Sequence, residues 1–190
     1  NGMIVKIVVI FLFSINLFAQ NIDFIAKESI KSILVGNGKN LQNNVDKLLI
    51  MEIPGFPGKP VELSWIILIE KSRNQKSLFV QYWTIPATTK EDEDLMPFLE
   101  KGIATHFSDY PTARFKINKH NDNVLQLIEN EGKDFMGVGV KKLDSNSYLV
   151  GILHDSEIFI YGQECNFDSK IFKNLLQEID LWLVPHRKKL

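Results

Sequence analysis

Two long apolar runs joined by a short polar turn constrain the fold of this chain more than any other feature. The first run, Val61–Ser72, places Trp65 and every second residue around it on one face, as in a β-strand. The second run, Ser77–Ile85, carries aromatic side chains on both faces, with Tyr82 on one and Trp83 on the other. The pair predicts two antiparallel strands in a sheet that is covered, at least in part, on both sides.

The remaining patterns predict a single α+β domain over residues 20–190. Apolar residues recur at helical spacing in three segments, and shorter alternating runs predict strands. We expect a mostly antiparallel sheet of seven or eight strands, covered by N-terminal, middle and C-terminal helices. The expected helices are at about 22–34, 95–107 and 169–183, and the expected strands are at about 48–53, 61–72, 77–85, 113–119, 124–130, 134–142, 147–153 and 157–162.

The C-terminal helix carries the clearest end signals. Asp168 is the expected N-cap, and Phe167 and Phe172 have the spacing of a hydrophobic staple. The broad apolar stripe predicts that this helix covers the sheet, and Pro185 is expected to end it.

The N-terminus has the layout of a bacterial secretory signal. Lys6 precedes the unbroken apolar run Ile7–Phe13, and the small residue Ala19 lies where a peptidase would cut. The apolar stretch spans about fifteen residues, whereas a helix that crosses a bilayer needs roughly twenty. We expect cleavage after Ala19, so that residues 1–19, with their two-residue leader, form a signal peptide; an uncleaved anchor is the alternative. The mature protein is then expected to be periplasmic or secreted.

Charge and motif content argue against several classes of function. The formal net charge of −1 is unlike that of a nucleic-acid binder, which needs a basic surface. The single cysteine, Cys165, permits neither an internal disulfide nor a cysteine-based metal site. The sequence contains no phosphate-binding glycine loop, nucleophile elbow or His-Glu-x-x-His motif. We therefore expect no cofactor, no metal and no nucleic-acid partner, and we favour a non-enzymatic function. Contact with a membrane is expected only through the N-terminal segment before cleavage.

Two histidines lie in predicted turns beside carboxylates, as half of a metal site or of an acid–base pair would. His120 is followed closely by Asp122, and His154 directly by Asp155. If the strands between 113 and 162 run up and down in turn, the two turns lie at opposite ends of the sheet, about 23 Å apart. We expect two ordinary turns rather than one shared site. A hydrolase with a dispersed site around either histidine is the alternative.

The stretch PGFPGKP, residues 54–60, is the first candidate binding site. It is expected to connect two neighbouring strands. Its prolines restrict φ and so reduce the entropy that a binding loop loses on association. Phe56 at the tip is then an apolar anchor, with Pro57 and Lys59 beside it. In the alternative interpretation, Phe56 folds back and caps one end of the core.

The second candidate is the aromatic group formed by Trp65, Tyr82 and Trp83, which either lines a groove or belongs to the core.

Three functions from different classes follow from these patterns. The first is an exported, non-enzymatic binding domain that recognises a protein partner, as an inhibitor or immunity protein does. The second is a carrier of an apolar small molecule between the sheet and the C-terminal helix, with Gly137, Gly139 and Gly151 letting the strands bend. The third is the hydrolase with a histidine-containing site.

Overall fold

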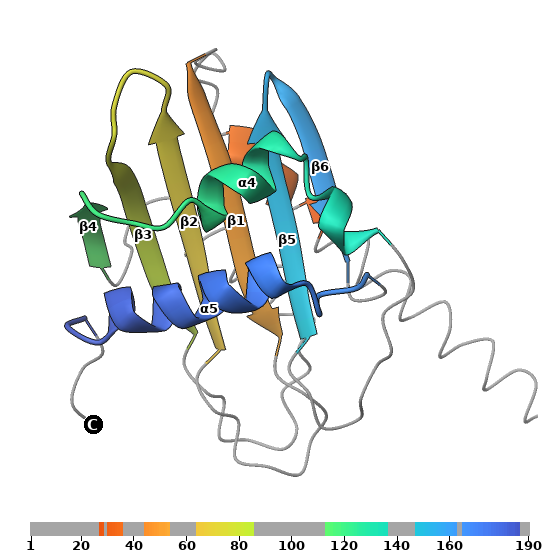
Figure 1. The fold of residues 1–190 in the computed structure, drawn as a ribbon. Helices are drawn as coiled ribbons and strands as arrows, with labels where there is room; N and C mark the ends of the chain where they lie inside the picture. Colours follow the sequence, from red (N-terminus) through yellow and green to blue (C-terminus); the bar gives the residue numbers. More distant parts are fainter. Residues whose placement is uncertain are drawn as a thin grey trace, which may run out of the picture.

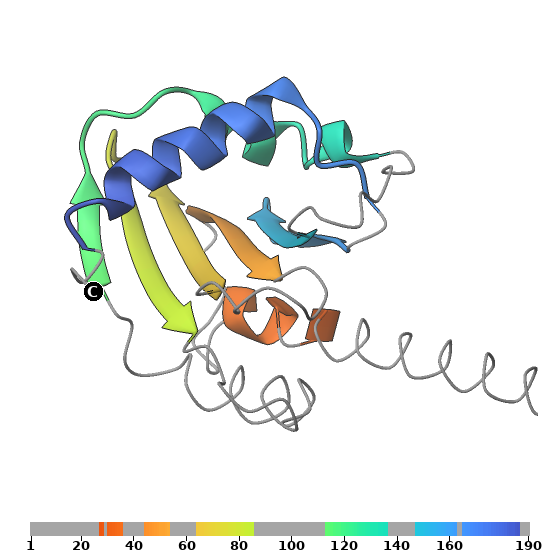
Figure 2. The same cartoon turned by 90° about the horizontal axis from the view of Figure 1, so that it is seen from below.

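The fold is an antiparallel sheet with helices packed on both faces (Figures 1 and 2). The structure is a computed structural model. It describes residues 27–28, 30–35, 44–53, 64–85, 113–136, 147–162 and 165–186. The predicted middle helix at 95–107 and the PGFPGKP stretch lie outside these residues. Among the described helices, none is long and apolar enough to cross a membrane.

The sheet has six strands within the described residues, in the order β4-β3-β2-β1-β5-β6, and every pairing is antiparallel (Figure 1). The predicted α+β class is therefore confirmed, but the expected seven or eight strands are not. The strands are β1 (Val45–Ile53), β2 (Ser64–Ser72), β3 (Leu78–Ile85), β4 (Ala113–Ile117), β5 (Ser147–His154) and β6 (Glu157–Tyr161).

Two predicted strands account for the difference in number. Residues 124–130 were expected to form a strand, but Asn123–Glu129 form helix α4. Val124, Leu127 and Ile128 are buried at the i, i+3, i+4 spacing of a helix, and this periodicity overrides the strand propensity of the β-branched residues. The next expected strand, 134–142, begins instead with the single 3-10 turn η2 (Lys133–Phe135), and its residues after 136 lie outside the described part of the chain.

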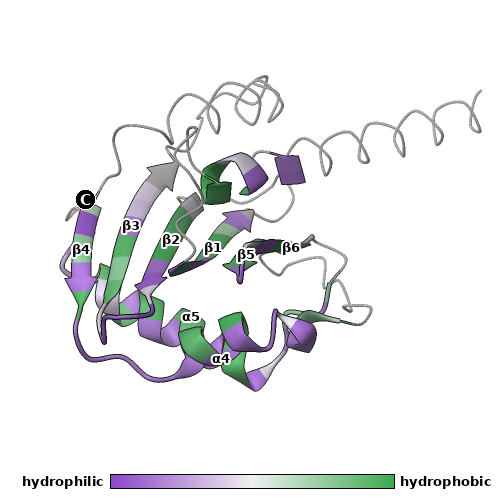
Figure 3. Cartoon of the chain, turned by 90° about the horizontal axis from the view of Figure 1, so that it is seen from above, coloured by the Kyte–Doolittle hydropathy of each residue, from purple (hydrophilic) through white to green (hydrophobic). Residues whose placement is uncertain are grey.

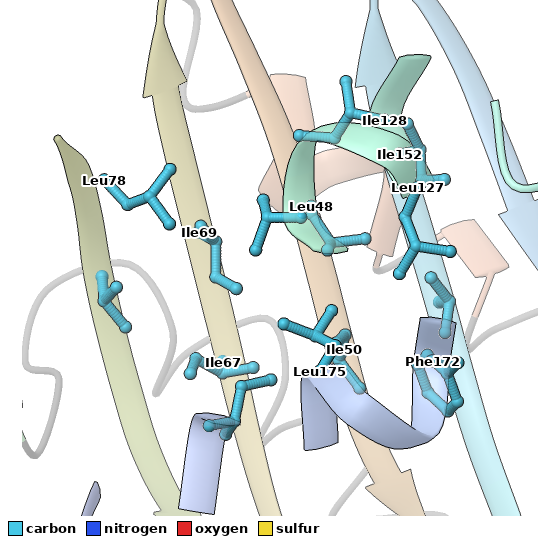
Figure 4. Packing of buried hydrophobic residues seen from close by; sticks show 14 of the residues in the cluster. Leu48, Ile50, Ile67, Ile69, Leu78, Leu127, Ile128, Ile152, Phe172 and Leu175 are labelled. Carbon is cyan, nitrogen blue, oxygen red and sulfur yellow. The ribbon is translucent and has the colours of Figure 1, made fainter. Parts of the chain in front are cut away.

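One face of the sheet is covered by α4 and by helix α5 (Lys170–Leu183), and we call it the helix-pair face (Figures 2 and 4). Strand residues such as Leu48, Ile67 and Ile152 pack there against Leu127 of α4 and Phe172 of α5. Helix α5 begins one residue later than predicted. Its N-cap is Ser169 rather than Asp168: the Ser169 hydroxyl accepts a hydrogen bond from the Phe172 backbone N–H at 3.2 Å.

Aromatic side chains fill the helix-pair face where α5 begins. Phe172 lies 5.2 Å from Phe135 and 5.3 Å from Tyr148, measured between ring centroids, and both pairs meet edge to face. Phe167 lies 5.3 Å from Phe172, so the two residues of the predicted staple do contact each other.

The opposite face is covered by the helical residues 30–35, and we call it the N-terminal-helix face (Figure 2). Ile30 and Leu34 are fully buried against strand residues that include Leu49 and Leu153. Gly151 of β5 makes this contact possible, because a Cβ at this position would lie 2.4 Å from the Ile30 Cγ2 atom. The central strands thus bury side chains on both faces. Figure 3 colours the hydrophobic residues of these strands green.

Candidate functional site

The predicted binding loop starts and ends on two paired central strands. β1 and β2 are antiparallel neighbours, so the chain between Ile53 and Ser64 connects adjacent strands, as predicted. Phe56, Pro57 and Lys59 lie outside the described residues. The structure therefore locates the base of the loop, and the loop's role as a binding site stays a prediction.

Three connections of the chain share the end of the sheet from which this loop departs. Ile53 pairs with Ser147, and Ser64 pairs with Ile85, while Ala113 pairs with Tyr82 nearby. The connections 54–63, 86–112 and 137–146 therefore all start or finish here, and we call this the loop end of the sheet. The short turns 73–77 and 155–156 and the polar stretch 118–122 lie at the opposite end, which we call the turn end (Figure 1).

The second candidate, the aromatic group, is divided between the two faces. Trp65 and Tyr82 pack with the cluster of the helix-pair face, whereas Trp83 packs with the cluster of the N-terminal-helix face. Tyr82 and Trp83 are buried and Trp65 is half-buried. Because successive residues of β3 point to opposite faces, the three rings do not line one common groove.

The turn end holds the densest group of charged side chains that the structure describes. It consists of Asp46, Arg73, His154 and Asp155, which we call the charge network. Arg73 Nη2 lies 3.0 Å from Asp46 Oδ1, and the same nitrogen donates to a carboxylate oxygen of Asp155. His154 Nδ1 lies 3.0 Å from Asp46 Oδ1, and its Nε2 lies 3.6 Å from Asp155 Oδ2. The network joins the start of β1 to the β2–β3 turn and the β5–β6 turn.

Asp46 is the buried centre of the charge network. Burial raises the pKa of the Asp46 carboxyl group, but hydrogen bonds from Arg73 and His154 outweigh it, so that the net pKa lies below the ordinary value. The pKa of Arg73 is raised by its hydrogen bonds to Asp46 and Asp155. Both shifts favour the charged forms, so Asp46 is a carboxylate and Arg73 a guanidinium at neutral pH.

The charge network holds its arginine and its histidine against its own two carboxylates. Both ring nitrogens of His154 face carboxylate oxygens of the network, and Arg73 bridges the two carboxylates. Among the described residues, no group of three or more His, Cys, Asp or Glu side chains has an arrangement that could hold a metal ion.

Both ring nitrogens of His120 lie within hydrogen-bond distance of backbone carbonyl oxygens. Nδ1 lies 2.9 Å from the carbonyl oxygen of Asn121, and Nε2 lies 3.0 Å from that of Lys76. The adjacent loop is held by the buried Glu178 of α5, which accepts a hydrogen bond from the Asn121 backbone N–H at 2.7 Å. The ring links the loop after β4 to the β2–β3 turn.

The predicted placement of the two histidines at opposite ends of the sheet is wrong. Both lie at the turn end, because residues 124–130 form α4 and do not return the chain as a strand. They are nevertheless apart, since β4 and β5 are four positions from each other in the sheet. At about 4.8 Å for each position, the separation is roughly 19 Å.

Asp46 and Arg73 are not among the candidate residues that the sequence patterns predict. The available signal was register: once β1 is paired with β5, with Lys47 opposite Leu153, Asp46 comes directly opposite His154. The pairing itself was not predictable from local patterns, since 108 residues separate Asp46 from His154.

Comparison with known proteins finds no relative. No family model matches the chain, and neither the curated proteins nor the solved structures contain a significant match.

Proposed function

We propose that this chain is an exported, non-enzymatic binding protein that recognises a protein partner through the PGFPGKP loop. Phe56 is the apolar anchor, and Pro57 and Lys59 complete the contact. The signal-like N-terminus supports a periplasmic or secreted location.

The observation that supports this proposal is that the PGFPGKP loop connects two paired strands in the centre of the sheet. The loop connects β1 and β2, whose residues Leu49, Ile50, Ile66 and Ile67 are fully buried. Strands packed on both faces form a rigid platform, and binding loops commonly lie on such platforms. The connections 86–112 and 137–146 also reach the loop end, where further contact area for a partner would come from.

The two alternatives gain less support. The carrier hypothesis places the ligand between the sheet and the C-terminal helix, with Gly151 letting a strand bend. Phe172, Leu175 and Ile179 of α5 are buried against the sheet there, and Gly151 faces the other side, against Ile30 and Leu34. Gly137 and Gly139 lie outside the described residues. The hydrolase hypothesis relies on His120 or His154. Both ring nitrogens of His120 lie against backbone carbonyl oxygens, and Nδ1 of His154 is hydrogen-bonded to Asp46.

The test is native mass spectrometry of the protein recovered from its host's envelope or medium. We expect the mass of residues 20–190 bound to a protein partner. Phe56→Ala should remove the partner, whereas Leu181→Ala, which truncates an exposed apolar residue of α5 that is 73% accessible, should retain it. A full-length mass would contradict the export step. A small-molecule adduct in place of a protein would favour the carrier, and equal loss in both variants would contradict a role specific to the loop.

A further inference from the structure

An exposed aromatic and cationic group lies on β3 and β4, on the N-terminal-helix face. It consists of Phe79, Gln81, Arg114 and Lys116, which we call the β3–β4 patch. In the register of the two strands, Phe79 is opposite Lys116 and Gln81 is opposite Arg114. All four lie on the same face as Trp83, because residues two apart in a strand share a face. Phe79 is 44% exposed, in contrast to the buried Trp83 four residues later.

The β3–β4 patch carries two positive charges without an acidic partner among the described residues. Lys116 Nζ lies 5.5 Å from the centre of the Phe79 ring, in the range of a cation–π contact. Glu70 is in register with Phe79, but its carboxylate already pairs with Lys47 at 3.3 Å. The patch is therefore locally cationic on a chain whose formal net charge is −1.

The strand that carries these charges also lies at the edge of the sheet. β4 is the first strand in the sheet order, and among the described strands it pairs only with β3 (Figure 1). An extended segment added along β4 would form backbone hydrogen bonds with its open side. Every second side chain of that segment would fall on the face of Arg114 and Lys116.

We propose that the β3–β4 patch binds an acidic, extended segment of the protein partner, added as a strand beside β4. Carboxylates at alternate positions of the segment pair with Arg114 and Lys116, and an apolar part of the segment packs on Phe79. This inference deepens the proposed function, on which it rests, by assigning the partner's chemistry at a second contact away from the PGFPGKP loop.

Protection against aggregation is the alternative explanation for the charges of Arg114 and Lys116 on the edge strand β4. Short edge strands with lysine are a common defence against unwanted strand pairing. β4 has only five residues and exposes Arg114 and Lys116. An edge strand that only prevents aggregation, however, needs no affinity for acidic segments. The neighbouring strand β3 would then have no need of the exposed Phe79. Affinity for an acidic peptide therefore separates the two explanations.

The experiment uses the purified mature protein and two short synthetic peptides, one alternating threonine and glutamate and the other alternating threonine and lysine. Binding is followed by backbone amide NMR shifts during titration. We expect the acidic peptide to shift the amides of 113–117 and 78–82, and the basic peptide to leave them unchanged. Affinity should fall several-fold as the ionic strength rises from about 0.01 M to about 0.15 M, because exposed charges are screened.

Variants identify the residues responsible. Arg114→Glu with Lys116→Glu should weaken binding of the acidic peptide by about tenfold or more, since each exposed pair contributes a few-fold. The double change to glutamine should give a smaller loss and guards against misfolding of the reversed variant. Lys170→Glu, an exposed cation on α5, is the matched control and should bind as the parent does.

Two results would overturn the inference: no shift at β4 with the acidic peptide, or equal weakening by the Lys170 control. Either result leaves the PGFPGKP loop untouched, since Phe56→Ala is tested separately against the native partner. Conversely, retention of the native partner by Phe56→Ala would contradict the loop proposal and would leave peptide binding at β4 untouched. The two proposals can therefore fail independently.

Discussion

The two faces of the sheet are buried by different means. On the helix-pair face, α4 and α5 cover the strands, and aromatic rings around Phe172 fill the space between them. On the N-terminal-helix face, the helical residues 30–35 reach the strands only because Gly151 has no side chain. The packing of the helix-pair face depends on large aromatic side chains. The close approach of residues 30–35 on the N-terminal-helix face depends on the missing side chain of Gly151.

The two faces also differ in which side chains of β3 and β4 remain exposed to solvent. α5 spans the sheet toward β4, where His186 stacks on Phe115 with 4.2 Å between ring centroids. The described helix of the other face contacts β5 through Gly151, while Phe79 and Lys116 on β3 and β4 remain exposed. Among the described residues of β3 and β4, more side chains are therefore exposed on the N-terminal-helix face than on the helix-pair face.

Phe172→Ala should give the largest loss of stability, since it removes a fully buried ring that packs against Phe135 and Tyr148. We expect a loss of about 3–5 kcal/mol in the free energy of unfolding, the usual cost of a buried Phe→Ala change. Denaturant unfolding measures it. Hydrogen exchange should quicken along 170–183 more than along 30–35. Uniform quickening of both helices would mean that the faces do not differ in this way.

Gly151→Ala tests the other face and should have a medium effect. The new Cβ would overlap Ile30 Cγ2 and Leu34 Cδ1, so these side chains or the helix that carries them must move. We expect a destabilisation of about 1–3 kcal/mol, typical of overpacking. Exchange should now quicken at 30–35 and remain slow at 170–183. A parent-like variant would show that the contact at Gly151 is not tight.

Asp46→Asn should have the smallest effect, because it acts at the turn end, where the charge network joins the two halves of the sheet. At pH 7 we expect a loss of about 1–2 kcal/mol, since one charged centre of several hydrogen bonds is removed from a partly solvated site.

The contribution of Asp46 to the free energy of unfolding should depend on pH. The pKa of Asp46 in the folded protein is lowered, so its stabilisation is present above the unfolded pKa of about 3.9 and is lost as the pH falls through the folded value. The difference between the parent and Asp46→Asn should therefore shrink below about pH 4. Thermal unfolding from pH 7 down to pH 3 measures it. A difference that stays constant over this range would show that Asp46 is not held as a carboxylate by Arg73 and His154.

Most strands were predictable because their signal is local. The runs around Trp65 and Tyr82 became β2 and β3 close to their expected bounds, and the C-terminal stripe became α5. The error at α4 arose where a short apolar run fits both periods. Val124, Leu127 and Ile128 fit a helix, but the alternating runs on either side of them favour a strand when the sequence alone is considered.

The candidate sites were predictable to different degrees. The sequence identified the loop between β1 and β2 as a strand connection, since proline and glycine punctuate the chain there. It identified His154 and Asp155 but not their partners Asp46 and Arg73. The β3–β4 patch was not found, because its four residues come from strands whose pairing no local pattern specifies.

By itself, the sequence determined the class of fold, the extent of the central strands and the apolar stripe of the last helix. These features depend on periods of two or 3.6 residues along the chain. Only the tertiary structure decided that β5 pairs with β1, that Asp46 meets His154, and that Gly151 receives Ile30. The physical reason is that register and close packing are set by contacts between residues more than a hundred positions apart, whose partners no window of neighbouring residues contains.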